Sequence, residues 1–196
     1  MSWIPKILKG GRKPTALEIL SSAQWHCASC DAPHEGRFAV AAFAPDPWPG
    51  GDGYEENGAI RFDGDFLSED FCVLDGQYFM VRACLDIPVH GMGTPFSFGA
   101  WSTLSRENFD KYLTGFDDGE YPDMGPWSGW LCNQLEDYVG NDPLAVWVVP
   151  QADRQRPKLY VMNDDHPLAI DQDHGISPDR VLDIYEYYGH RPSELG

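Results

Sequence analysis

Hydrophobic and polar residues alternate through residues 78–89, and this two-residue period predicts a β-strand with one face in the core. The apolar face is formed by Phe79, Val81, Ala83, Leu85 and Ile87. A short apolar run at residues 71–74 precedes this strand, and the dipeptide Asp75-Gly76 between the two runs is typical of a tight hairpin turn. We therefore expect an antiparallel hairpin, followed by another strand at residues 96–104.

Three further segments have the composition of strands. Residues 37–43 are short and mostly apolar, residues 145–149 are fully apolar, and residues 158–162 alternate. The aromatic segment at residues 127–138 fits neither the helical nor the strand period and is left without an assignment.

Two helices are predicted, at residues 105–116 and 177–188. Ser105 and Ser177 are suitable N-caps, and Pro178 stands at the first helical position, where its missing N–H costs nothing. Helical spacing relates the apolar residues of each segment: Phe109, Tyr112, Leu113 and Phe116 in the first, and Val181, Leu182, Ile184, Tyr185 and Tyr188 in the second. The pattern as a whole predicts the α+β class, with an antiparallel sheet meander and a few packed helices.

The chain has 196 residues, which is enough to bury a full hydrophobic core without help from disulfides. We expect a single α+β domain at residues 25–190, preceded by a basic leader at residues 1–24 and followed by a short tail at residues 191–196.

The leader is basic and amphipathic at its start. Residues 1–17 carry four bases and no acid, and one helical face collects Trp3, Ile4, Ile7 and Leu8. It lacks the apolar run of ~7–15 residues that a signal peptide needs, and no stop-transfer segment follows. We expect it to fold onto an acidic body, with a frayed end as the alternative and membrane contact disfavoured. A cytoplasmic location is predicted for the protein.

The charge balance restricts the partners. Fourteen Lys and Arg face 31 Asp and Glu, for a formal charge of −17, and most of the surface therefore repels nucleic acid and anionic lipid. Nucleic-acid binding is not expected. A basic protein is the partner that this charge favours, although acidity can also serve solubility alone.

The sharpest local signal is the pair Cys27-x-x-Cys30 in the segment WHCASCDAPH. In a reducing cytoplasm the five cysteines are expected to be thiols or metal ligands rather than disulfides. Two thiolates three residues apart on a tight turn can reach one ion, and zinc is the usual occupant. We expect a structural zinc on this N-terminal Cys knuckle; buried metal-free thiols and redox chemistry are the alternatives.

One such pair supplies half of a zinc site, so two further ligands are needed. His34 lies four residues after Cys30, and Cys72 lies at the end of a predicted strand, where its side chain can approach the knuckle. The predicted ligands are Cys27, Cys30, His34 and Cys72. Other residues that stay open as ligands are His26, Cys84, Cys132 and His166.

The order of motifs along residues 25–185 resembles a bacterial domain-of-unknown-function family, the one numbered 2199. The motifs are the knuckle CxxCxxxHE, the segments DFCVL, YFMVR, LDIP, WSTLS and GWL, and the run DHPLA. The resemblance implies that Cys27 and Cys30 belong to a shared pattern, with Cys72 as a further candidate. It implies no established activity.

A second cluster, Asp164-Asp165-His166-Pro167, places two carboxylates beside an imidazole. Such a cluster can orient a general base or bind a hard metal ion. Asp and His are also common in a turn before proline, since Pro167 holds the preceding residue extended. We favour the structural turn and keep His166 and Asp165 as weak catalytic candidates.

Two functions therefore compete. The first is a non-enzymatic acidic binding or inhibitory protein, similar in kind to an immunity protein, that acts on a basic partner. The second is a metal-assisted, hydrolase-type enzyme built on His166 and neighbouring aspartates. Binding is preferred because the sequence offers no clear nucleophile or open metal site. Trp127, Trp130 and Trp147 could stack on a ligand, but aromatic side chains are more often in the core.

Overall fold

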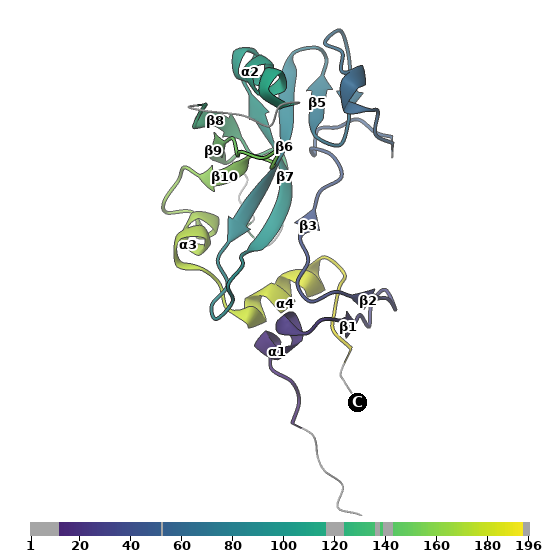
Figure 1. Ribbon diagram of the computed structural model, residues 1–196, viewed down its shortest axis with the longest axis vertical. Coiled ribbons are helices and arrows are strands. Elements are labelled where there is room, and N and C mark those ends of the chain that lie inside the picture. The colour runs from purple at the N-terminus through teal and green to yellow at the C-terminus, as the bar shows by residue number, and fades with distance from the viewer. Residues whose placement is uncertain (1–11, 52, 117–123, 136–137, 139–142, 194–196) are drawn as a thin grey trace, which may run out of the picture.

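A long antiparallel pair of strands, β6 (Tyr78–Ile87) and β7 (Phe96–Leu104), forms the centre of the computed structural model (Figure 1). The structure describes residues 12–51, 53–116, 124–135, 138 and 143–193. The two strands pair from Phe79 opposite Leu104 to Ile87 opposite Phe96. The alternate apolar residues of β6 are all buried, as their spacing predicted.

The hairpin before β6 has the predicted turn. Strand β5 (Phe71–Leu74) pairs antiparallel with β6, and both turn residues, Asp75 and Gly76, have positive φ angles of 52° and 64°. The Gln77 N–H donates to the Leu74 carbonyl oxygen (2.9 Å), and three residues connect the paired Leu74 and Tyr78, so the hairpin has a tight three-residue connection in which Asp75 and Gly76 supply the positive φ angles. A two-residue strand, β4 (Phe66–Leu67), extends this antiparallel region beyond β5.

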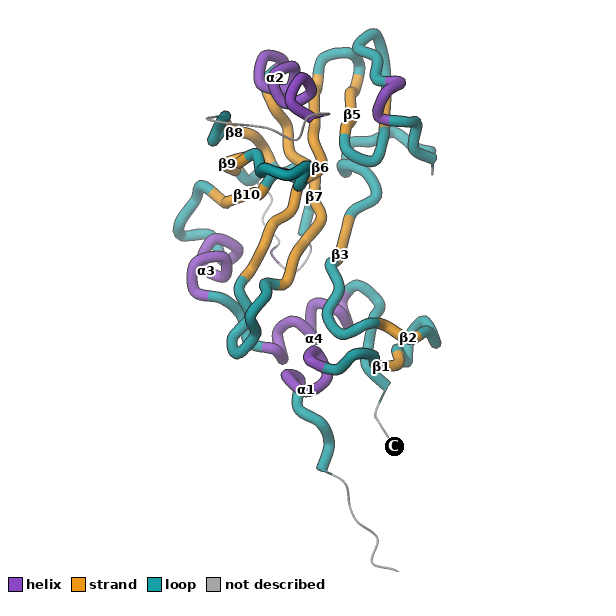
Figure 2. The backbone as a smooth tube through the Cα atoms, in the orientation of Figure 1, coloured by secondary structure: helices purple, strands orange, loops and turns teal. Residues whose placement is uncertain are grey.

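The predicted α+β class is confirmed, but the sheet as a whole is mixed and curled, so the expected antiparallel meander is wrong. Its strand order is β3-β7-β6-β10-β9-β8, where β8 spans Trp127–Trp130, β9 Ala145–Val149 and β10 Lys158–Val161. Strand β10 runs parallel to β6, and the short β3 (Val40–Ala41) runs parallel to β7. Figure 2 shows β6 and β7 side by side, with β8, β9 and β10 on one side and β3 on the other.

The curl brings the end of β8 back to β7. The Trp130 N–H donates to the Thr103 hydroxyl oxygen (2.9 Å), and the Cys132 N–H donates to the Trp101 carbonyl oxygen (2.8 Å). Gly129 stands at this contact, where a Cβ atom would lie 2.2 Å from the Thr103 carbonyl oxygen. A residue without a side chain is therefore required for the sheet to curl this tightly.

Two of the four α-helices in the described part of the chain were predicted. They are α2 (Arg106–Phe116) and α4 (Pro178–Tyr187), and the predicted caps hold: the hydroxyl oxygens of Ser105 and Ser177 accept backbone N–H groups of the first turns. The helices α1 (Ala16–Ser21) and α3 (Pro167–His174) were not predicted. The first is only six residues long and the second buries a single residue, so neither carries an apolar stripe. No helix among the described residues is long and apolar enough to cross a membrane.

The helices cap the two ends of the curled sheet: α2 at one end, and α3 and α4 toward the other (Figure 1). Helix α1 and the two-stranded hairpin β1 (Trp25–His26) and β2 (Pro33–His34) lie beyond α4. Helix α1 packs on α4, and its Leu20 is buried in the core. The first 11 residues of the predicted leader, with its apolar face, lie outside the described part of the chain.

The sheet has a core on each face. The main core fills the inner face and the contacts with α2 and α4. A smaller core on the outer face, beside β5 and β6, consists of Leu67, Cys72, Leu74, Met80 and Trp101. Residues of the segment after β3, including Ala42, Ala44 and Trp48, cover it.

The closure at Gly129 gives a first prediction. Gly129→Ala should lower the free energy of unfolding by about 2–3 kcal/mol, because the added methyl group must displace the backbone of β7. The matched control is Gly58→Ala, whose Cβ would meet no atom within 4 Å and which should change stability by less than about 0.5 kcal/mol. Urea unfolding followed by circular dichroism measures both. Equal stability of the two variants would contradict the tight contact between β8 and β7.

Candidate metal centre

The Cys27-Cys30 pair lies at the tip of the hairpin formed by β1 and β2. The Cys27 N–H donates to the Ala32 carbonyl oxygen (2.9 Å), and the Asp31 N–H donates to the Cys27 carbonyl oxygen (3.1 Å). Asp31 adopts a positive φ of 55°, a conformation that aspartate tolerates better than most residues. The hairpin register then places His34 opposite Trp25, on the strand that returns from the tip.

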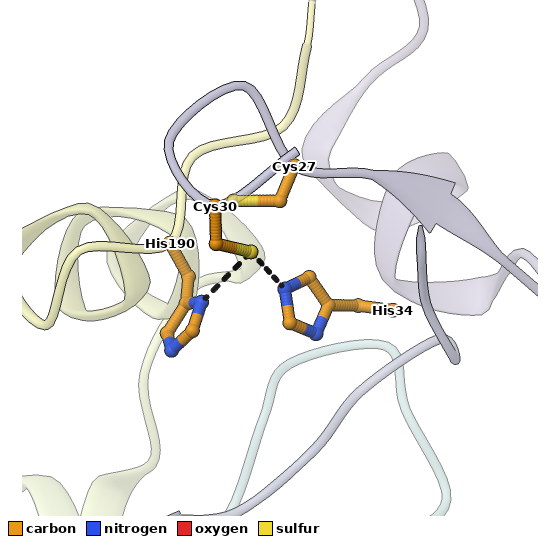
Figure 3. Close-up of side chains that lie close together, drawn as sticks. All are labelled: Cys27, Cys30, His34 and His190. Carbon is orange, nitrogen blue, oxygen red and sulfur yellow. Dashed lines mark hydrogen bonds between the residues drawn. The ribbon is translucent and has the colours of Figure 1, made fainter. Parts of the chain in front are cut away.

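The fourth member of the cluster, His190, comes from the segment after α4. The Ala28 N–H donates to the Arg191 carbonyl oxygen (2.7 Å), and the Ser193 N–H donates to the His26 carbonyl oxygen (2.8 Å). Pro192 forms an antiparallel bridge with Cys27. The segment therefore runs beside the knuckle like a third strand, and His190 faces the two cysteines (Figure 3).

The four ligand atoms, one each from Cys27, Cys30, His34 and His190, all lie within 4.8 Å of one another. The Cys30 Sγ lies 3.3 Å from His34 Nε2 and 4.0 Å from His190 Nδ1 (Figure 3). A tetrahedral ion with bonds of about 2.0–2.3 Å has its ligands about 3.3–3.8 Å apart, so small side-chain movements complete the geometry. This cluster can hold a metal ion.

The surroundings of Cys27 favour the thiolate, which is the form that binds metals. Burial of the side chain raises the pKa of this thiol, but hydrogen bonds from the backbone N–H groups of Cys30 and Ser29 outweigh that effect and lower it to about 5. At neutral pH the folded chain therefore holds Cys27 ionised, with no proton to displace when an ion enters.

An aromatic cluster holds the two histidines in place. The His34 ring lies 4.8 Å from the Trp25 ring and 4.8 Å from Phe38, and Phe38 meets His190 edge-on at 5.2 Å. Phe38 stacks on Tyr185 of α4 at 4.2 Å, and the Tyr185 hydroxyl both donates to and accepts from the Phe38 backbone. The imidazoles are thus supported by the same helix that delivers His190.

The structure does not bring Cys72 to this cluster, and His190 takes the place that the sequence analysis assigned to it. Cys72 is fully buried in the smaller core of the outer face, beside Trp101. Burial raises the pKa of its thiol to about 12, so it is a neutral thiol at physiological pH. Cys72 does lie close to the hairpin turn after β5, as expected. However, the alternation of side chains along β5 directs the Cys72 side chain to the face that carries Met80, away from the knuckle.

His166 and Asp165 also lie apart from the four-residue cluster. His166 is the N-cap of α3, where its Nδ1 accepts the Leu168 N–H (3.2 Å). The Asp165 side chain is exposed, and its backbone N–H donates to Asn163 Oδ1 (3.2 Å). While Nδ1 accepts this bond, the neutral imidazole carries its proton on Nε2, so the ring has no free lone pair with which to act as a general base.

The comparisons with known proteins match residues 26–176 to one family, DUF2199, described as uncharacterized proteins conserved in bacteria. The chain belongs to DUF2199. The resemblance expected from the motifs is thereby confirmed, and the DUF2199 match includes Cys27, Cys30 and His34 but ends before His190. No curated protein and no solved structure matches the chain.

Sequence reasoning missed His190 because nothing local marks it. It lies 160 positions after Cys30, and its approach depends on how α4 packs against the first hairpin. The available signal was the incomplete set: a knuckle with one following histidine needs a fourth ligand, and His190 directly follows the glycine that ends the last predicted helix.

The capping role of His166 yields a second prediction. His166→Ala should reduce the free energy of unfolding by about 1 kcal/mol, because the Leu168 N–H loses its acceptor. His166→Asn keeps a capping oxygen and should match the wild type. Thermal unfolding of the three proteins measures the effect, and an Asn variant as unstable as the Ala variant would show that capping is not what this side chain contributes.

Proposed function

We propose that the protein is a non-enzymatic binding protein with a structural zinc held by Cys27, Cys30, His34 and His190. The observation that carries the proposal is the completeness of the ligand set: four side chains of one chain meet at one point. Catalytic zinc sites keep a position open for water or substrate, whereas structural sites are closed by four protein ligands. A closed site supports a structural role.

The donor set favours zinc among the divalent ions. Two thiolates and two imidazoles match the Cys₂His₂ composition of many structural zinc sites, whereas carboxylate and carbonyl oxygens are what magnesium and calcium prefer. The buried thiolate of Cys27 adds a negative charge that the ion neutralises. Zinc therefore suits both the chemistry and the electrostatics of the cluster.

An ion at this position would join two distant parts of the chain. The knuckle and the segment after α4 are otherwise connected by few backbone hydrogen bonds, those of Ala28 with Arg191 and of Ser193 with His26. A bound ion would form one bond to His190 and three to Cys27, Cys30 and His34, and would so link the two segments. Zinc would hold the last residues of the described chain against the first hairpin.

The acidic composition supports the second part of the proposal, a basic protein as partner. The formal charge of −17 accelerates association with a cationic surface, as it does for inhibitors that bind basic proteins. Immunity-like inhibition is one form of such binding. A metal-assisted hydrolase built on His166 and Asp165 is the weaker candidate, because the His166 acceptor nitrogen caps α3.

Metal analysis tests the zinc site. We expect protein purified without chelator to carry about one zinc per chain, and Cys30→Ser and His190→Ala to reduce this to less than half, because three ligands bind zinc more weakly than four. Cys72→Ser and His174→Ala, outside the cluster, should keep the metal. Elemental analysis of the purified proteins gives the contents.

Two results would overturn this assignment. One is a metal content well below one zinc per chain in the wild type after refolding with excess zinc. The other is a loss of metal in Cys72→Ser equal to that in His190→Ala, since Cys72 lies in the smaller core of the outer face and His190 lies in the four-residue cluster.

The charge proposal has a separate test with defined probes. A deca-arginine peptide should bind the protein, and its affinity should fall at least tenfold between about 0.05 and 0.5 M salt, where the Debye length shrinks roughly threefold. A deca-glutamate peptide is the matched control and should not bind. Titration calorimetry measures both, and salt-independent binding of deca-arginine would contradict the electrostatic basis.

A further inference from the structure

Three aromatic side chains lie exposed on the outer face of β8, β9 and β10. Trp130 is 53% exposed, Trp147 40% and Tyr160 50%. The core was the expected place for Trp127, Trp130 and Trp147. Trp127 does pack against the main core, whereas Trp130 and Trp147 lie at the surface. We call Trp130, Trp147 and Tyr160 the aromatic face.

Strand alternation explains why these rings point outward. Their neighbours along the strands, Val146, Val148, Leu159 and Val161, fill the main core, so the residues between them face away from it. Trp147 on β9 lies directly opposite Tyr160 on β10. Trp130 on β8 lies opposite Ala145, which is two residues before Trp147 on β9 and therefore on the same face. Side chains at such positions are near enough to form one continuous surface.

Acidic side chains border the aromatic face at Tyr160. A cavity of about 590 Å³ between β10 and α3 is lined by Tyr160 and Ile170, with Asp164 and Asp173 at its polar side. A second cavity, of about 340 Å³, has Tyr160 and Asp86 in its wall. Among the described residues, no basic side chain forms an ion pair with Asp164. Asp173 lies 3.5 Å from Nδ1 of the exposed His174, which also lines the first cavity, and Asp86 is paired with Lys158 at 2.6 Å.

We propose that the aromatic face is the docking surface for the basic partner, and that a cationic side chain of the partner, arginine above all, enters the cavity beside Tyr160. This proposal rests on the proposed function, because it assigns a place on the protein to the contact with the basic partner. The π faces of Trp and Tyr attract cations, and the guanidinium group stacks on such rings better than an ammonium group does.

The same features disfavour other occupants of this surface. A second copy of this chain would bring another −17 charge to the contact, and an anionic ligand would meet Asp164 and Asp173. An arginine side chain satisfies both parts of the cavity: its aliphatic stem lies along Ile170 and Tyr160, and its charged end reaches the carboxylates.

Strand variants test the aromatic face. Trp147→Thr and Tyr160→Thr replace exposed rings by a residue that suits strands. Each should weaken the binding of deca-arginine about threefold, as expected for the loss of one exposed cation–π contact. The matched control is Tyr78→Thr, an exposed strand tyrosine near the Asp75-Gly76 turn, which should leave the affinity unchanged.

A comparison of two peptides separates stacking from simple charge. Wild-type protein should bind deca-arginine about fivefold more tightly than deca-lysine, and this preference should disappear in the double variant Trp147→Thr, Tyr160→Thr. Asp173→Asn should weaken both peptides about equally, and Asp63→Asn, which removes an exposed charge outside the cavity, should weaken them less. Calorimetric titrations at about 0.05 M salt give the affinities, and thermal melting confirms that each variant is folded.

The outcomes distinguish this proposal from the function on which it rests. If deca-arginine binds every variant as tightly as the wild type and the binding still weakens with salt, the aromatic face is wrong and the basic partner stands. If the wild type binds neither cationic peptide, both proposals fail. Loss of affinity in the Trp147 and Tyr160 variants with an unchanged Tyr78 control supports the docking surface.

Discussion

The antiparallel pairing of β6 and β7 creates two faces with opposite roles, and the remaining elements arrange themselves around these faces. Residues opposite each other in the pair share a side of the sheet, so Val81 and Ser102 face inward while Met80 and Thr103 face outward. The inner face becomes the main core, which α2 and α4 close. The outer face is covered at β5 by the segment after β3 and left open at β9 and β10. The pairing of β6 with β7 thus determines which side of the sheet becomes the main core and which side carries the exposed aromatic residues.

Local pattern was sufficient for the elements whose neighbours in sequence are also their neighbours in space. The β5 and β6 hairpin, β7, α2 and α4 each carry their own signals, such as Asp75-Gly76 or Ser177-Pro178. The parallel pairings of β10 with β6 and of β3 with β7 carry none, because Lys158 and Cys84 come together only after the chain has passed through β7, α2, β8 and β9. A helix such as α3, which buries only Leu168, has no apolar stripe along the sequence by which it could be predicted.

The candidate site divides in the same way. Cys27, Cys30 and His34 belong to one hairpin, so their spacing in the sequence was enough to predict part of a metal site. The choice between Cys72 and His190 depended on packing: one lies under Trp101 in the outer core, and the other is carried to the knuckle by α4 and the stack of Phe38 on Tyr185. Neither position can be read from spacing along the chain, since both depend on which faces of the elements meet.

The four residues of the Cys/His cluster are far apart in the sequence, so they become available at different times during synthesis. Translation delivers Cys27, Cys30 and His34 early, and His190 follows Cys30 by 160 positions. At roughly 5–20 residues per second, the ribosome needs about 8–32 s to synthesise the chain between them. During that interval the nascent knuckle presents only three of the four ligand groups, and a chain that stops before residue 190 never acquires the fourth. The complete cluster can therefore form only in a polypeptide that extends past residue 190.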